Sequence, residues 1–98
     1  MRYKIEFKEE ALEDVKSAYK YYEESAEGLG DDFLNKLEEY IIIIEDNPFL
    51  FEAKHKPFRE VKIKRFPYLI VYEIEENKVI VYSVFHTKRS PQNKYQKQ

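Results

Sequence analysis

The sequence predicts a small α+β fold whose elements follow the order β-α-α-β-β-β. An N-terminal segment alternates apolar and charged residues, residues 8–47 repeat apolar side chains every three or four positions, and residues 58–86 hold three strand-like runs. Period two is typical of half-buried strands and period 3.6 of helices. A chain of 98 residues with 43% hydrophobic side chains is long enough for one core. We therefore expect residues 1–98 to form a single domain.

The first strand is expected over residues 2–7. Tyr3, Ile5 and Phe7 lie on one side of the alternating pattern, and charged side chains occupy the other. Successive side chains of a strand point to opposite faces of a sheet. One face of this strand should therefore pack against a core.

Two helices are expected within residues 8–47. One apolar stripe extends from Ala11 to Tyr22, and acidic residues crowd its first turns, where the helix dipole favours negative charge. A second stripe extends from Phe33 to Ile44. A short turn between the two stripes makes an antiparallel helical hairpin the expected arrangement.

The ends of the second helix are predicted from turn and capping residues. Gly28 and Gly30 bracket the turn before it, and Asp31 or Asp32 can cap its N-terminus. Its C-terminus is expected at Asn47–Pro48, because the residue before a proline avoids the α-helical region. Residues 49–57 then form a connector.

Three C-terminal strands are expected at Phe58–Lys64, Tyr68–Glu75 and Lys78–His86. A tight turn is expected between the last two strands, because Asn77 can adopt positive φ there. Short connections of this kind should make the three strands an antiparallel meander. The N-terminal strand is expected to join the same antiparallel sheet. The helical hairpin should pack on one face of the sheet, and basic residues should occupy the other. Residues 90–98 are expected to be a loose tail.

The charge is divided unevenly along the chain. Residues 1–53 carry a net charge of −9, whereas residues 54–98 carry +7. Such asymmetry favours a basic face that attracts polyanions or acidic protein. The alternative interpretation is that the charged side chains of both halves are only in contact with solvent and attract no partner.

Several functional classes are excluded or disfavoured by composition. The chain has no cysteine, which excludes disulfides and thiolate zinc sites. Two separated histidines without a cluster of acidic residues in the strand half give no metal ligand set, and no glycine-rich phosphate loop is present. We expect no cofactor. The longest aliphatic run, Ile41–Ile44, is too short to span a membrane, and the N-terminus lacks a signal peptide, so we expect a cytoplasmic protein.

Three segments give the chain a family resemblance. The first is Ala18–Glu23 followed by Gly28–Phe33, the second is Lys64–Ile74, and the third is Val81–Pro91. In this order and spacing they resemble the RelE/ParE superfamily of bacterial toxins, and the first segment resembles the ParE-like branch. The likeness covers residues 3 to 91.

The resemblance implies a toxin that a cognate antitoxin holds inactive. RelE-like members cleave messenger RNA on the ribosome. ParE-like members act on DNA gyrase and need no nuclease chemistry. A third possibility is an inactive toxin or a non-toxic binding module.

Ribonuclease chemistry would need an acid, a base and a group that stabilises phosphate charge. The resemblance places the catalytic groups at His86, Arg89 and Tyr95, but a second arginine position of RelE-like enzymes is Leu69 here. His86 is the natural acid or base, because the reference pKa of histidine lies near neutral pH. A structural hydrogen bond at a strand end is the alternative interpretation for His86, and His55 is a second candidate. The leucine favours the ParE-like function.

Binding is predicted more firmly than catalysis. An acidic, unstructured antitoxin segment should fold onto a basic, partly apolar sheet edge and cleft, with Arg59, Arg65, Lys88 and Arg89 meeting its carboxylates and nearby apolar side chains supplying affinity. The same basic residues could contact nucleic acid. The candidate binding residues are Lys54, Lys56, Arg59, Lys62, Lys64, Arg65, Lys88 and Arg89.

Overall fold

A computed structural model of the chain describes residues 2–88. The predicted class and element order are confirmed. The last two strands have the predicted bounds. The elements are β1 (Lys4–Phe7), α1 (Glu9–Ser25), α2 (Leu29–Asp46), β2 (Arg59–Lys62), β3 (Tyr68–Glu75) and β4 (Lys78–His86).

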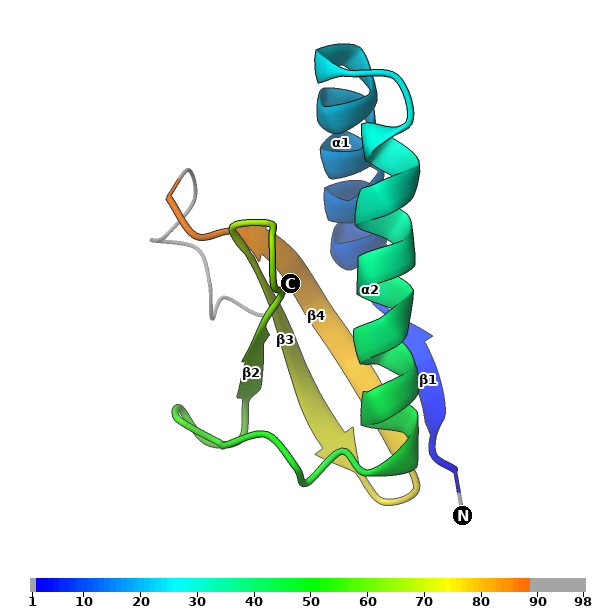
Figure 1. The fold of residues 1–98 in the computed structure, drawn as a ribbon. Helices are drawn as coiled ribbons and strands as arrows, with labels where there is room; N and C mark the ends of the chain where they lie inside the picture. The colour runs from blue at the N-terminus through cyan, green and yellow to red at the C-terminus, as the bar shows by residue number, and fades with distance from the viewer. Residues whose placement is uncertain (1, 89–98) are drawn as a thin grey trace.

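Both helices cover one face of a four-stranded sheet with the strand order β1-β4-β3-β2 (Figure 1). Strands β2, β3 and β4 form the predicted antiparallel meander. Strand β1, however, pairs in parallel with β4, so that Lys4 lies beside Lys78, and the sheet is mixed where we expected it to be antiparallel throughout. The reason is directional. The helical hairpin returns the chain to the end of the sheet at which β1 begins, so β2 runs in the same direction as β1. The chain then reverses into β3 and reverses again into β4, so β4 also runs parallel to β1.

Helix α2 begins at Leu29, earlier than the predicted caps Asp31 and Asp32, which lie in its first turn. The residue before it, Gly28, has φ 86° and turns the chain in the left-handed region, which glycine adopts without steric cost. The aspartates therefore act through the helix dipole rather than as caps.

Glu23 supplies the cap from the preceding helix. Its carboxylate accepts hydrogen bonds of 3.0 Å from the backbone N–H groups of Gly28 and Gly30. Gly30 is buried, and a Cβ at this position would lie 2.8 Å from ring carbons of Tyr19. The absence of a side chain at Gly30 thus lets the two helices approach closely.

The turns differ in detail from the predictions. In the β3–β4 turn, positive φ falls on Glu76 (54°) and not on Asn77. Strand β2 is shorter than predicted, because the chain already turns at Arg65, which has φ 78°. At the other end, Phe58 donates its backbone N–H to His55 within a local turn and does not join the strand.

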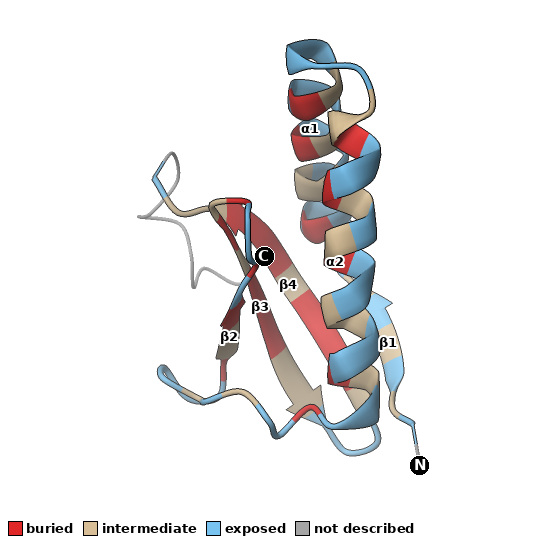
Figure 2. Cartoon of the chain, viewed as in Figure 1, coloured by how far each residue is buried: buried red, intermediate tan, exposed pale blue. Residues whose placement is uncertain are grey.

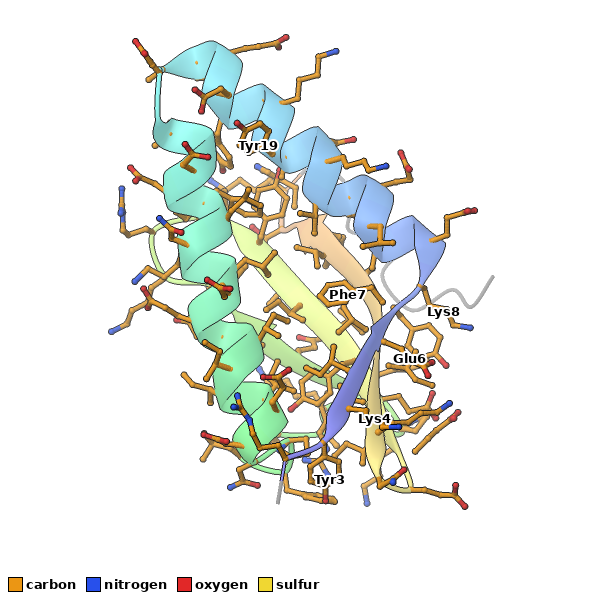
Figure 3. The ribbon with its side chains drawn as sticks, turned by 90° about the vertical axis from the view of Figure 1, so that its right-hand side faces the viewer. Tyr3, Lys4, Glu6, Phe7, Lys8 and Tyr19 are labelled. Carbon is orange, nitrogen blue, oxygen red and sulfur yellow. The ribbon has the colours of Figure 1, made fainter. Side chains whose placement is uncertain are left out.

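The core lies between the helices and the sheet (Figure 2). Phe33 and Ile44 of α2 and Ile70 and Tyr72 of β3 are fully buried in it. Strand β1 adds the partly buried Phe7, whose ring is directed away from the side that carries Lys4 and Glu6 (Figure 3). The alternation predicted for residues 2–7 is therefore realised.

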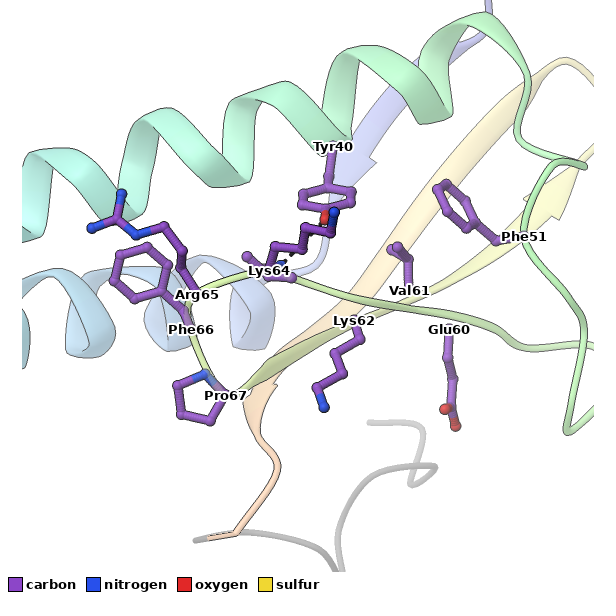
Figure 4. Close-up of a pocket in the computed structure, with 10 residues that line it drawn as sticks. Tyr40, Phe51, Glu60, Val61, Lys62, Lys64, Arg65, Phe66 and Pro67 are labelled. Carbon is purple, nitrogen blue, oxygen red and sulfur yellow. Dashed lines mark hydrogen bonds between the residues drawn. The ribbon is translucent and has the colours of Figure 1, made fainter.

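The face of the sheet opposite the helices is less basic than expected. Val71, Ile80 and Phe85 alternate with helix-facing neighbours and are all buried. Lys62 is directed to this side of β2, but so is Glu60 (Figure 4). Basic residues therefore concentrate at the edge of the sheet rather than across its face.

Candidate functional site

A groove of about 790 Å³ lies along the outer edge of β2 (Figure 4). Tyr40 of α2 and Phe51 of the connector stand on one side of it, and β2 with the following turn forms its floor and far wall. We call this the β2 groove. Its lining residues are Tyr40, Phe51, Glu60, Val61, Lys62, Ile63, Lys64, Arg65, Phe66 and Pro67.

The groove exists because β2 is an edge strand. Ile63 donates its backbone N–H to Tyr68 of β3, so the N–H groups of Lys62 and Lys64, at alternate positions, point away from β3. The Lys64 N–H indeed donates to the Tyr40 hydroxyl at 3.2 Å. Within residues 2–88, no hydrogen-bond partner is found for the outward N–H and C=O of Lys62. Unpaired edge groups of this kind are a template for another strand.

The groove is electropositive at one end. Lys62, Lys64 and Arg65 line it, against the single carboxylate of Glu60. No ion pair within the described part of the chain involves Lys62 or Lys64, and Arg65 reaches Asp32 only at 4.0 Å, with both side chains more than half exposed. Exposed pairs of this geometry contribute little to stability. The three cations are therefore available to an anionic partner.

Arg65 has an unusual backbone for its residue type. Its φ of 78° lies in the left-handed region, which costs a non-glycine residue about 1 to 2 kcal/mol. The guanidinium lies over the Phe66 ring, 5.3 Å from its centroid. The turn thus fixes a cation at the rim of the groove, and strained residues of this kind concentrate at binding sites.

Arg59 has a different environment from the other predicted binding residues. Its Nη1 donates to the backbone carbonyl of Phe51 at 2.6 Å, and its guanidinium lies 5.1 Å from the centroid of the Phe49 ring. Arg59 thereby holds the connector against β2. Its charge is only partly available to a partner.

Lys54 and Lys56 lie exposed on the connector, next to the bridge between His55 and Phe58. This is the end of β2 where Arg59 pairs with Tyr72, whereas Arg65 follows the other end. About four residues of strand, roughly 13 Å, separate the two ends. The connector lysines therefore form a second basic segment, separate from the groove cations.

His86 and Lys88 lie at the same end of the sheet as the Arg65 turn. His86 pairs with Tyr68 across the β3–β4 ladder, and Thr87 donates its N–H to Pro67 at 2.8 Å. The imidazole packs edge-on against Tyr68, with the ring centroids 5.2 Å apart. Its Nδ1 accepts the Lys88 N–H at 3.1 Å, so the proton of the neutral ring is on Nε2. These contacts are the kind expected if His86 makes a structural hydrogen bond at the end of its strand.

The remaining nuclease candidates are not assembled around His86 within residues 2–88. His55 lies at the opposite end of β2, and Arg89 and Tyr95 fall outside the described residues. Leu69, at the position of an arginine in RelE-like enzymes, is paired with Lys62 on one side and Phe85 on the other. An aliphatic side chain there cannot stabilise phosphate charge.

Sequence reasoning missed the apolar wall of the groove. Tyr40 lies within the predicted stripe from Phe33 to Ile44 and Phe51 within the predicted connector, and nothing local in the sequence shows that both face β2. The aromatic richness of residues 49–51 was the one available signal.

The described residues offer neither a metal cluster nor a membrane-spanning helix. Residues 2–88 contain no group of three or more His, Cys, Asp or Glu side chains that could hold a metal ion. In the same range, no helix is both long enough and apolar enough to span a bilayer.

Several solved structures from toxin–antitoxin systems are similar to this fold. A chain from the chromosomal ParDE system of P. aeruginosa has a TM-score of 0.76 at 9% identity, covering 87% of this chain and 96% of that one. A chain of the intact E. coli RelBE toxin–antitoxin complex has a TM-score of 0.69 at 22% identity, covering 89% and 99%. A chain of the E. coli DinJ–YafQ toxin–antitoxin complex has a TM-score of 0.63 at 16% identity, covering 88% and 93%. At these identities the likeness shows a common fold.

The sequence itself identifies the family. No curated protein matches it. The family model described as the ParE toxin of the type II toxin–antitoxin system parDE matches residues 5–91, nearly the whole chain. The protein therefore belongs to the ParE toxin family of type II toxin–antitoxin systems.

Proposed function

We propose that this protein arrests growth by acting on DNA gyrase in the cytoplasm, without nuclease chemistry. The observation that carries the proposal is the family match over residues 5–91. Leu69 supports it, because this residue occupies the position where RelE-like enzymes use an arginine. The hydrogen bond that Nδ1 of His86 accepts from Lys88 also favours a structural role for that histidine.

A RelE-like ribonuclease is the second candidate. It is favoured by the cluster of Lys62, Lys64 and Arg65 at one end of the β2 groove, a charge distribution that also suits a phosphate backbone. His86, Arg89 and Tyr95 would then be its catalytic residues. An inactive toxin or a non-toxic binding module is the third candidate.

The proposed partner is a cognate antitoxin with an acidic segment that folds on binding. The solved structures with a similar fold include chains of toxin–antitoxin complexes. On this chain, the groove cations and the exposed connector lysines would attract the segment, and Tyr40 and Phe51 would supply apolar contact. Association should weaken as salt is added, because the attraction is electrostatic.

Growth under tight induction of this chain, in a host that lacks the antitoxin, tests the function. Arrest with double-strand DNA breaks and continued translation is the expected result. Arrest with cleaved messages, lost in the His86→Ala and Arg89→Ala variants, would establish the ribonuclease instead. Normal growth with abundant folded protein would leave only the inactive toxin or binding module.

The same cultures test the partner. Co-expression of the cognate antitoxin should restore growth, and charge reversal at Arg65 and Arg89 should weaken the complex. Rescue that is insensitive to both reversals would contradict the proposed charge complementarity.

A further inference from the structure

We propose that two copies of this chain associate through their β1 strands, which pair antiparallel about a two-fold axis and join the two sheets into one. Lys4 of each copy would then lie opposite Glu6 of the other. The inference goes beyond the proposed function and does not depend on it. It concerns the edge of the sheet farthest from the β2 groove.

The backbone of β1 leaves its outer edge open. Lys4 and Lys8 donate their N–H groups toward β4, at 3.4 and 2.9 Å. The N–H and C=O groups at alternate positions, those of Ile5 and Phe7, therefore point away from β4. Within residues 2–88, no hydrogen-bond partner is found for these outward groups. Unpaired groups at a sheet edge are a template for another strand.

The edge is also accessible and partly apolar. Figure 3 looks onto it, and β1 lies in front of the other strands, in the opening between the two helices. Tyr3, Ile5 and Phe7 pack against the core but are only partly buried. A second β1 beside them would cover apolar surface that a single copy leaves in contact with water, which favours association.

Hydrogen bonding restricts the register of the two strands. In an antiparallel ladder, residues that exchange both hydrogen bonds are directly opposite one another. Ile5 can therefore face Ile5, Tyr3 or Phe7 of the second copy. If Ile5 faces Ile5, each Phe7 N–H bonds the Tyr3 carbonyl of the other copy. The N–H of Tyr3 already donates to the Glu45 carbonyl at 3.0 Å, so the ladder ends there.

Charge selects one of these registers. If Ile5 faces Ile5, Lys4 of each copy faces Glu6 of the other, in the closely spaced pairs that lack mutual hydrogen bonds. If Ile5 faces Tyr3, Lys4 meets Lys4, and if Ile5 faces Phe7, Glu6 meets Glu6. Like charges directly opposite are destabilising. Strand β1 is thus complementary to itself in a single register.

Both charged side chains can make this contact. Lys4 has no ion pair within the described part of the chain, and Glu6 reaches Lys78 of β4 only at 3.4 Å, with the glutamate side chain 58% exposed. Exposed pairs of this kind contribute little, so Glu6 can also interact with a second copy. An edge that carried only lysines would repel its own copy, whereas the alternation of Lys4 and Glu6 attracts it.

The expected assembly is a closed dimer. A two-fold contact uses the same residues of both copies, so no free β1 edge remains for a third. Strand β2 lies at the opposite edge of each sheet, so the joined sheet would carry one β2 groove at each end. Strand β1 has only four residues, which makes a small interface, and the dimer should dissociate on dilution.

The test measures the Kd of the dimer by sedimentation of the purified full chain over a series of concentrations at low salt. Lys4→Glu and Glu6→Lys should each weaken the dimer at least tenfold, because each places like charges opposite one another at two contacts. The variant that carries both substitutions exchanges the charges and should restore the Kd to within threefold. Lys20→Glu, an exposed charge reversal on α1, is the matched control and should have no effect.

Mixing the two single variants makes the test specific. Lys4→Glu gives a β1 with carboxylates at both positions, and Glu6→Lys gives one with ammonium groups at both. Neither variant should pair with itself, but the mixture should form a dimer about as tight as that of the native chain. A mixture that stays monomeric would contradict the proposed contact. Circular dichroism confirms that each variant is folded.

Disulfide cross-linking tests the register. The sequence has no cysteine, so introduced thiols report on this contact alone. In a mixture of Lys4→Cys and Glu6→Cys, the two cysteines would be directly opposite, with Cα atoms about 4.5 Å apart, which a disulfide can span. In either variant alone the thiols would be diagonal neighbours, about 7 to 8 Å apart. The mixture should therefore cross-link at least tenfold faster.

Three results would overturn the proposal. The first is a native chain that stays monomeric throughout the concentration series. The second is a dimer whose Kd does not respond to Lys4→Glu or Glu6→Lys, or responds equally to Lys20→Glu. The third is equal cross-linking of the mixed and single cysteine variants. None of these results bears on growth arrest, which tests the proposed function separately.

Discussion

The phenol of Tyr72 donates a hydrogen bond of 2.6 Å to the backbone carbonyl of Pro48. Tyr72 belongs to β3, the strand next to the edge, and is fully buried, while Pro48 follows the end of α2. The bond fixes the point at which the chain leaves the helical layer for the connector. Burial raises the pKa of Tyr72 to about 12, so the phenol remains a donor at all ordinary pH values.

Replacing Tyr72 with phenylalanine tests this attachment. Tyr72→Phe keeps the ring but leaves the Pro48 carbonyl without its buried donor, which costs about 1 to 3 kcal/mol. We expect the midpoint of urea unfolding to fall while the slope of the transition is unchanged. An unchanged midpoint would show that the carbonyl finds another donor.

Gly30→Ala should destabilise the helical hairpin, although alanine is the better helix former. The substitution gains about 1 kcal/mol in helix propensity. However, the new Cβ would lie 2.8 Å from the Tyr19 ring and 2.9 Å from the Glu23 carboxylate, so the helices must separate or Tyr19 must move. Overpacking of this kind costs about 1 to 3 kcal/mol. A net loss in thermal stability is expected, and a gain would contradict the close approach.

Glu23→Ala should cost about 1 kcal/mol, the typical cost of losing an N-terminal cap. Two N–H groups at the start of α2, those of Gly28 and Gly30, lose their acceptor. Glu24→Ala, at an exposed position on α1, is the matched control and should be nearly neutral. Chemical unfolding of both variants makes the comparison, and equal effects would show that the cap contributes nothing.

Asp14 should make stability depend on pH. Its carboxylate accepts the Val84 N–H at 3.0 Å and thereby ties α1 to β4. Burial raises the pKa of Asp14 to about 6, the Val84 hydrogen bond opposes the rise, and the charge of Glu10 adds to it. Because the folded state then holds the proton more tightly than the unfolded state, the contribution of Asp14 to stability falls as pH rises from about 4 to 6.

Asp14→Asn removes this dependence and keeps an oxygen that can accept the Val84 N–H. The variant should be more stable than the native chain at pH 7.5, and the difference should vanish near pH 3.5. Two pKa units correspond to roughly 3 kcal/mol, which we discount to about 1 kcal/mol because the carboxyl is only half-buried. Urea unfolding of both proteins across this range is the measurement. A difference that is constant with pH would contradict the raised pKa.

Local patterns predicted most of the fold because its signals are local. The apolar runs of β3 and β4 and the turn between them predicted the bounds of both strands to the residue. The start of α2 was misplaced because Glu23, on the other helix, supplies the cap. The parallel pairing of β1 with β4 follows from the number of times the chain reverses between the two strands. The periodicity of apolar residues gives the type of each element but not its direction.

The candidate site was less predictable than the fold. Its cations were found from charge asymmetry, but charge alone does not separate Lys62, at the open edge of the sheet, from Arg59, which binds the connector. Tyr40 and Phe51 join the groove only because distant segments meet beside β2. The strained backbone of Arg65 has no sequence signal, since arginine rarely adopts positive φ.

The pairing of β1 with β4 also determines when the protein can become native during synthesis. The first strand made must wait for the last, because Lys4 to Phe7 find their partners only at Lys78 to Val81. Contacts so distant in sequence form late and slow folding. A nascent chain can thus build its helical hairpin on the ribosome, but it closes its sheet only after β4 has been made. A partly synthesised copy is therefore structurally incomplete.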